Sequence, residues 1–217
     1  MVSKRIKFIA SLICSDDKVL DIGTDHALLP IFLIKNNMVS VADGSDISDQ
    51  VITNAKNNVN INKLSTKINL FVSDGVKNIQ TNKYNTFVIT GMGFYTIKNI
   101  LENADLSSIN KMIIQSNNNY EDLRRFVNHH GYKIVKDYYI MDKNKTYLII
   151  YLIKGKQVLS DTEYLCGLYD SSNVWYYEYV VNKNEKLLSK IPPEKGEKIK
   201  LEIELYNNYL TREKIEE

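Results

Sequence analysis

Short apolar runs alternate with longer amphipathic stretches over the first 155 residues of this 217-residue chain. The short runs are rich in β-branched residues, which favours buried strands, and the longer stretches space their apolar positions three and four apart, which favours helices. We predict a first helix over residues 3–13, followed by five strands that alternate with four helices. The strands are expected at Lys18–Ile22, Val39–Gly44, Ile68–Val72, Phe87–Thr90 and Met112–Gln115, and the helices at Leu28–Asn36, Asp49–Asn60, Tyr95–Ala104 and Tyr120–His130.

Two further strand-like runs, Ile134–Met141 and Tyr147–Ile153, are joined by Asp142-Lys143-Asn144-Lys145, a segment typical of a hairpin turn. Strands that alternate with helices through short connections predict a parallel sheet covered on both faces. The expected fold class is therefore α/β, with a Rossmann-like parallel sheet closed by an antiparallel hairpin. This layout resembles that of class I methyltransferases.

The pattern becomes helical from Asp161 onward. Two amphipathic stretches, Val174–Ile191 and Lys198–Arg212, are separated by Pro192-Pro193, which must break a helix. They predict an antiparallel helical hairpin, which is either coiled-coil-like or a plain amphipathic pair docked on the main domain. We accordingly expect two domains, a catalytic domain over residues 1–157 and a C-terminal helical hairpin over residues 158–217.

Composition and charge narrow the class of protein. A hydrophobic fraction of 44% with 25% charged residues is ordinary for a soluble globular protein, and neither a signal peptide nor a membrane span is predicted, so the cytoplasm is expected. Cys14 and Cys166 have no disulfide or metal spacing, and no metal is expected. Residues 1–159 hold 20 Lys and Arg against 14 Asp and Glu, whereas the remainder holds 8 against 12. A polyanionic partner would therefore be attracted to the first segment, although an ordinary solvated surface would have the same surplus.

Candidate chemistry begins where the first strand ends, in Asp21-Ile22-Gly23-Thr24-Asp25-His26-Ala27-Leu28-Leu29-Pro30. Glycine allows a ligand to approach the backbone closely, and the N-terminus of the following helix favours a negatively charged group. A dinucleotide site would need Gly-x-Gly-x-x-Gly in this turn, and only one glycine is present. The turn therefore fits a nucleoside cofactor.

Glycines and acids recur at the ends of the first four strands. Parallel strands bind ligands outside their carboxyl ends, so these residues are expected along one edge of the sheet. Asp46 lies 23 residues after Gly23, as a ribose-binding acid requires, and Asp43 is its competitor. Asp74-Gly75 suits the amino group of an adenine. The glycines are at positions 23, 44, 75, 91 and 93, and the acids at 21, 25, 43, 46 and 74.

The fourth and fifth strands end in Thr90-Gly91-Met92-Gly93 and Gln115-Ser116-Asn117. Met92 is either a core residue or a contact for cofactor or target base, and the amides offer hydrogen bonds to the edge of a base. The three prolines are at 30, 192 and 193, so the Asn/Asp-Pro-Pro-Tyr/Phe signature of many exocyclic-amine methyltransferases is missing. This counts against adenine-N6 chemistry.

Asp-Ile-Gly-Thr-Asp-His-Ala-x-Leu-Pro at 21–30, Thr-Gly-Met-Gly at 90–93 and Gln-x-Asn at 115–117 together resemble the bacterial tRNA (adenine-N1) methyltransferases of the TrmK type. Ser3-Lys4-Arg5-Ile6 and the C-terminal helical pair are also similar to that family. The resemblance implies S-adenosylmethionine as cofactor and methylation of adenine 22 in the D-arm of tRNA. A monomer is expected, although nothing in the sequence decides the oligomeric state. For this reaction Asp25 and His26 are the catalytic candidates nearest the methyl group, and Asn117 would position the base. Because the C-terminal segment is acidic, the phosphate contacts are expected mostly from Lys4, Arg5 and other basic residues of the first domain. The expected cofactor contacts are Asp21, Gly23, Thr24, Asp46, Ile47, Asp74, Gly75, Gly91 and Met92.

Two departures and several alternatives stay open at this point. Leu28 replaces a tyrosine that is frequent in the family, and Ser116 replaces a proline, so only the amides of that segment carry over. His26 could instead be a buried structural histidine. The function could be S-adenosylmethionine-dependent methylation of another RNA or of a small molecule, or non-catalytic nucleoside binding in which the helical tail serves as an interaction module.

Overall fold

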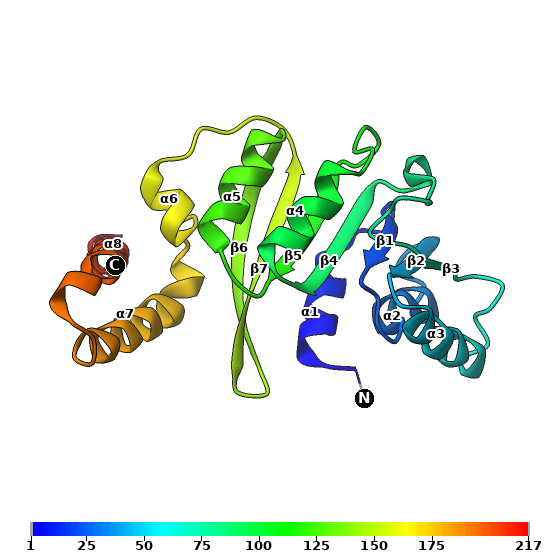
Figure 1. The fold of residues 1–217 in the computed structure, drawn as a ribbon, viewed down its shortest axis with the longest axis horizontal. Helices are drawn as coiled ribbons and strands as arrows, with labels where there is room; N and C mark the ends of the chain where they lie inside the picture. The colour runs from blue at the N-terminus through cyan, green and yellow to red at the C-terminus, as the bar shows by residue number, and fades with distance from the viewer. Residues whose placement is uncertain (1, 217) are drawn as a thin grey trace. The chain divides into compact units, whose positions relative to one another are not determined.

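The computed structural model describes residues 2–216, without the side chains of residues 193 and 213–216. Its seven-stranded sheet has the order β3-β2-β1-β4-β5-β7-β6 (Figure 1). The first five strands are parallel, and β7 runs antiparallel to both β5 and β6, which confirms the predicted Rossmann-like sheet and its closing hairpin. The strands are β1 (Lys18–Ile22), β2 (Val41–Asp46), β3 (Leu70–Val72), β4 (Thr86–Met92), β5 (Lys111–Ser116), β6 (Tyr132–Asp142) and β7 (Lys145–Lys154).

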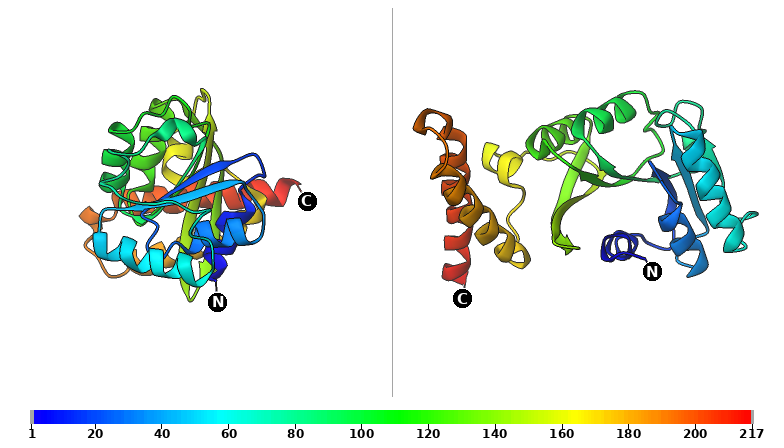
Figure 2. Two further views of the ribbon diagram at one scale, coloured as in Figure 1. Left: turned by 90° about the vertical axis from the view of Figure 1, so that its right-hand side faces the viewer. Right: turned by 60° about the horizontal axis from the view of Figure 1, so that its bottom comes forward.

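Helices cover both faces of this sheet. Buried side chains of α1, α2 and α3 form one hydrophobic core with the central strands, and α4 lies on the opposite face (Figure 2). The apolar faces read from the sequence thus form the core that holds the strand ends in place. No described helix is long and apolar enough to cross a membrane. The helices are α1 (Lys4–Ser11), α2 (Leu28–Lys35), α3 (Asp49–Ile61), α4 (Phe94–Glu102), α5 (Tyr120–His129), α6 (Asp161–Cys166), α7 (Val174–Leu188) and α8 (Glu197–Glu216).

Strand β2 differs from its predicted bounds, because it starts two residues later and continues to Asp46. Gly44, Ser45 and Asp46 pair with β3, so polar residues form the end of a paired strand where the sequence pattern suggested a loop. The β6–β7 turn agrees with prediction. Lys143 and Asn144 both have positive φ, 48° and 61°, as a two-residue type I′ hairpin turn requires.

The chain divides into two compact units, and the second consists of residues 158–217 together with Tyr120–Arg125 of α5. Within this second unit α7 packs along α8, and the buried side chains between them include Tyr177, Tyr206 and Tyr209. The Tyr209 hydroxyl donates to the Gly167 carbonyl at 2.7 Å. Arg124 is 1% exposed, and its Nη1 donates to the Tyr164 and Leu165 carbonyls of α6 at 3.0 and 3.2 Å. Within this unit the buried arginine therefore joins the first part of α5 to α6.

Candidate active site

A cavity of about 280 Å³ opens at the carboxyl ends of β1 and β4. Its walls are the loop after β1, the end of β4 and one side of α1, so the first helix is part of the site as well as of the core. Sequence reasoning assigned no site role to Ile6 and Ile9 of α1, because their apolar spacing indicated only a buried helix face. The lining residues are Arg5, Ile6, Ile9, Asp21, Gly23, Thr24, Asp25, His26, Leu28, Leu29, Thr90 and Gly91.

The loop after β1 approaches β2 and β4 closely. Gly23 has φ +77°, and its N–H and that of Thr24 donate to the Ser45 carbonyl at 2.8 and 2.9 Å. A Cβ at position 23 would lie 2.2 Å from the terminal methyl carbon of Met92. Glycine is therefore required here by both backbone conformation and space. Met92 packs against this turn, so one methionine joins two of the sequence-predicted cofactor segments.

Asp21 lies at the base of the site and is 5% exposed. Burial raises the pKa of its carboxyl from 3.8 to about 6, although a hydrogen bond from the Thr24 hydroxyl and the charge of Arg5 oppose that rise. The Thr24 hydroxyl donates to Asp21 Oδ2 at 2.7 Å. A buried acid with a shifted pKa beside a cavity is a candidate for binding a cationic group of a ligand.

Asp25 and His26 stand at the cavity wall as an exposed pair. Asp25 Oδ1 and His26 Nε2 are 3.5 Å apart, and their side chains are 72% and 51% exposed. The histidine is therefore not the buried structural residue that the sequence left open. Asp25 has φ +50° and Ala27 φ +54°, so this short segment holds two non-glycine residues in the left-handed region.

The end of β4 is shaped by a bulge opposite β5. The register shifts between Thr90 and Met92, and Gly91 takes φ +82° with open space where a side chain would be. Gln115 Oε1 accepts from the Gly91 N–H at 3.1 Å, and Asn117 Nδ2 donates to the Gly91 carbonyl at 2.8 Å. Two side chains from β5 and its end thus hold the bulged glycine.

The Gln115 side chain hydrogen-bonds to residues from three parts of the site. It is 1% exposed, and its Oε1 also accepts from Arg5 Nη1 at 3.3 Å, while its Nε2 donates to Asn117 Oδ1 at 3.1 Å. The amides of Gln115 and Asn117 were expected to face a base, and in this structure they hydrogen-bond to each other and to Gly91. Asn117 is nevertheless exposed at the edge of the site. Only the fold brings Arg5 within reach of residues 110 positions away.

Lys4 and Arg5 differ in their surroundings although they are adjacent in sequence. Lys4 is exposed, whereas Arg5 is half-buried, lines the cavity and places its guanidinium 4.7 Å from the centre of the Tyr147 ring. Arg5 is therefore turned into the site and Lys4 toward solvent.

The second strand end separates the two candidate ribose acids. Asp43 is buried within β2, where it accepts hydrogen bonds from the backbone and side chain of Asn69 and from the Tyr84 hydroxyl. Asp46 lies at the carboxyl end of β2, and its Oδ1 accepts from the Ser48 N–H at 2.9 Å. Asp43 is therefore committed to the fold, and Asp46 is the acid at the site edge.

The residues that follow β3 continue this edge of the sheet outside the cavity. Gly75 has φ +65°, and the neighbouring Asp74 forms an ion pair with Lys77. The buried Ser73 hydroxyl has no hydrogen-bond partner among the described residues. Ile47 is 70% exposed beside Asp46. A separate stretch of the same edge, which does not line the cavity, is formed by Asp46, Ile47, Asp74 and Gly75.

Among the described residues no cluster of His, Cys, Asp and Glu could hold a metal ion.

Comparison with known proteins places this geometry in a family. A family model described as a methyltransferase domain matches residues 2–150. A putative tRNA methyltransferase of Mycoplasma genitalium is 33% identical over 168 residues, which span 76% of this chain and 75% of that protein. The tRNA (adenine(22)-N(1))-methyltransferase of Bacillus subtilis is 28% identical over 151 residues, which span 69% of this chain and 63% of that protein.

A solved structure is similar over nearly the whole chain. TrmK of M. capricolum, in complex with its natural cofactor product S-adenosyl-homocysteine, is 30% identical with a TM-score of 0.84, covering 97% of this chain and 98% of that one. The predicted resemblance is confirmed. The chain belongs to the methyltransferase family and, within it, to the TrmK family of tRNA methyltransferases.

Proposed function

We propose that this protein transfers a methyl group from S-adenosylmethionine to N1 of adenine 22 in the D-arm of tRNA. The observation that carries the proposal is the match along 97% of the chain to a TrmK structure that holds S-adenosyl-homocysteine. The cavity at the carboxyl ends of β1 and β4 supports it, because ligands of open α/β sheets bind at this edge.

The residues at the site edge fit a nucleoside cofactor with an amino-acid arm. Gly23 carries no side chain in its positive-φ turn, so a ligand can approach the backbone there closely. The carboxylate of Asp46 keeps Oδ2 without a hydrogen bond among the described residues, as a ribose hydroxyl would require. The buried hydroxyl of Ser73 lies next to Asp74 and Gly75, which we assign to the adenine side together with Ile47. Asp21, Thr24, Gly91 and Met92 would hold the methionine arm.

When bound, S-adenosylmethionine supplies an electrophilic methyl group. N1 of neutral adenine already carries a lone pair, so the chain does not need a strong base to start the reaction. The methylated base is cationic, and the exposed carboxylate of Asp25 at the cavity wall is placed to stabilise that developing charge. We assign His26 to the same wall and Asn117 to positioning the base. Leu28, which is 40% exposed, lines the cavity and supplies an apolar contact where the family often has a tyrosine.

Partner and location follow from the same proposal. The tRNA substrate supports action in the cytoplasm. Lys4 is proposed as a phosphate contact because it is exposed on the helix that walls the cavity. Arg5 would act within the cavity.

Nucleoside analysis tests the proposed function directly. The protein is incubated with S-adenosylmethionine and either a tRNA that has adenine at position 22 or the same tRNA with guanine there. We expect 1-methyladenosine only in the first tRNA. If both tRNAs are methylated equally, or if 6-methyladenosine forms, the proposed site of methylation is wrong.

A further inference from the structure

The β6–β7 hairpin projects beyond the sheet on the side of the active site. β7 pairs with β5 only from Ile150 to Ile153, whereas β6 and β7 pair with each other along their whole length. Since β7 is antiparallel to β5, residues 145–149 continue toward the carboxyl end of β5. The free half of the hairpin therefore overhangs the edge where the cavity opens (Figure 1).

Helix α1 and this overhang form one wall. The Arg5 N–H donates to Asp142 Oδ2 at 3.3 Å, and the rings of Phe8 and Tyr138 meet edge to face with centroids 5.1 Å apart. Tyr147 carries two cations on its ring, Arg5 from the cavity at 4.7 Å and Lys145 at 5.2 Å from its centre. The tip of the hairpin is thus coupled to a residue that lines the active site.

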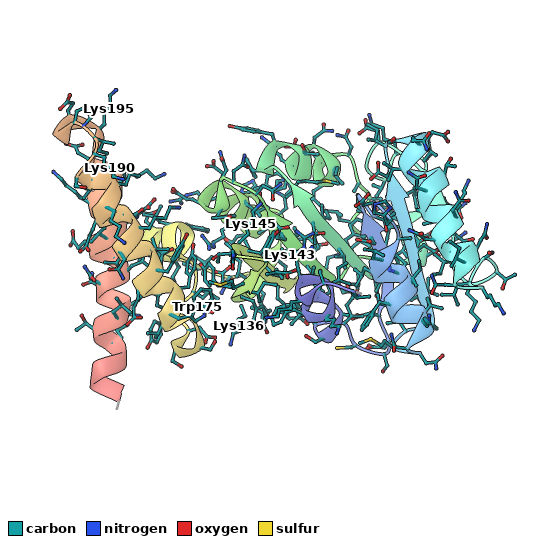
Figure 3. All side chains as sticks on the ribbon, turned by 90° about the horizontal axis from the view of Figure 1, so that it is seen from below. Lys136, Lys143, Lys145, Trp175, Lys190 and Lys195 are labelled. Atoms are coloured by element: carbon teal, nitrogen blue, oxygen red, sulfur yellow. The ribbon has the colours of Figure 1, made fainter. Side chains whose placement is uncertain are left out.

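The wall is strongly basic. Residues 2–8 and 138–149 hold five Lys and Arg side chains against one acid, Asp142. Asp142 is half-buried and accepts from the Arg5 N–H, so positive charge predominates on this wall. Lys4, Lys143 and Lys145 are exposed, and Lys136 lies further along the same hairpin (Figure 3). An exposed cationic surface with aromatic rings beside it suits a nucleic-acid backbone.

We propose that this surface, defined by Lys4, Lys136, Lys143 and Lys145, binds the phosphate backbone of the tRNA substrate beside the target adenine. The inference rests on the proposed function and adds the hairpin to the RNA-binding residues. The type I′ turn holds Lys143 in a fixed backbone conformation, and the Tyr147 ring orients Lys145, so both charges are ordered before RNA binds. Met141, which is 53% exposed at the tip, adds an apolar contact.

The test removes two charges without disturbing the turn. The variant Lys143→Asn/Lys145→Gln keeps a residue that tolerates positive φ at the first position. The control Lys63→Asn/Lys67→Gln changes two exposed lysines of the α3–β3 connection, and Lys63 also has positive φ, 59°. The tRNA dissociation constant of each full-length protein is measured between 50 and 200 mM KCl, and S-adenosyl-homocysteine binding is measured by calorimetry.

We expect the hairpin variant to bind tRNA about tenfold more weakly at low salt, and the slope of log K against log [salt] to become shallower by about 2. The control variant should match the wild type, and both variants should keep wild-type affinity for S-adenosyl-homocysteine. An unchanged dissociation constant and salt slope in the hairpin variant would overturn the inference. Failure of the wild type to methylate adenine 22 would instead overturn the proposed function.

Single variants cover the case in which the double change harms folding. Lys145→Gln lies in β7, outside the turn, and Lys4→Gln lies on α1. Each should make the salt slope shallower by about 1 while S-adenosyl-homocysteine binding is kept. If neither single variant changes the slope, the phosphate backbone docks elsewhere and the inference is wrong.

Discussion

Replacing Asp21 by Asn should stabilise the free protein while weakening cofactor binding. The buried carboxyl has its pKa raised from 3.8 to about 6, which means that the folded state holds the proton more tightly than the unfolded chain does. Burial of Asp21 costs no stability while the carboxyl is protonated in both states, below about pH 4. The cost grows as the pH rises and is complete above pH 6. At about 1.4 kcal/mol per pKa unit, the full cost is about 3 kcal/mol.

Asn removes this cost because its side chain stays neutral and its amide oxygen can still accept a hydrogen bond from the Thr24 hydroxyl. The free energy of unfolding of Asp21→Asn should therefore exceed that of the wild type by about 3 kcal/mol at pH 8 and by about 1 kcal/mol at pH 4.5. The assay is urea unfolding of both proteins without cofactor at the two pH values. Asp16→Asn, at an exposed position in the same region, is the control and should show no such pH-dependent gain.

Cofactor binding should change in the opposite direction. If the ionised carboxylate of Asp21 pairs with the ammonium group of the methionine arm, Asp21→Asn should bind S-adenosyl-homocysteine at least tenfold more weakly at pH 8. A variant that is no more stable than the wild type at pH 8, or that gains the same stability at both pH values, would show that burial of the Asp21 carboxylate carries no such cost.

Further changes test the other strand ends. Gly23→Ala should destabilise the fold by about 1–2 kcal/mol in urea unfolding, because it combines a positive φ with a 2.2 Å approach to Met92, and adding Met92→Ala should recover part of that loss. Asp46→Ala should weaken S-adenosyl-homocysteine binding in calorimetry about tenfold with an unchanged Tm; full affinity would exclude it from the ribose site. Asp43→Ala should lower the free energy of unfolding by about 3 kcal/mol, because it leaves buried donors unpaired, and a stable variant would contradict that role. Asp25→Ala should reduce the single-turnover methylation rate at least tenfold while cofactor affinity stays within twofold; an unchanged rate would remove it from the reaction.

Some elements could be predicted because local patterns suffice to form them. Lys18–Ile22 matches β1 at both ends, since its apolar run is bounded by charge on one side and by glycine on the other. The hairpin turn at Lys143 and Asn144 could also be predicted from the sequence, because its backbone geometry depends on these two residues alone. The bounds of β2 were wrong at both ends, because pairing with β3 draws Ser45 and Asp46 into the strand despite their polarity.

Local pattern was enough to predict the parallel sheet, its closing hairpin and the edge at which acids and glycines gather, because alternation of strands and helices brings all the carboxyl ends to one side. The partners of those residues could be read only from the folded chain. Asp43 accepts hydrogen bonds from Asn69 and Tyr84 inside the fold, so it is not available at the site edge. Arg5 donates to Gln115, 110 positions away, and therefore lies in the cavity. Such roles depend on which partners folding brings within hydrogen-bond distance, and spacing along the chain does not contain that information.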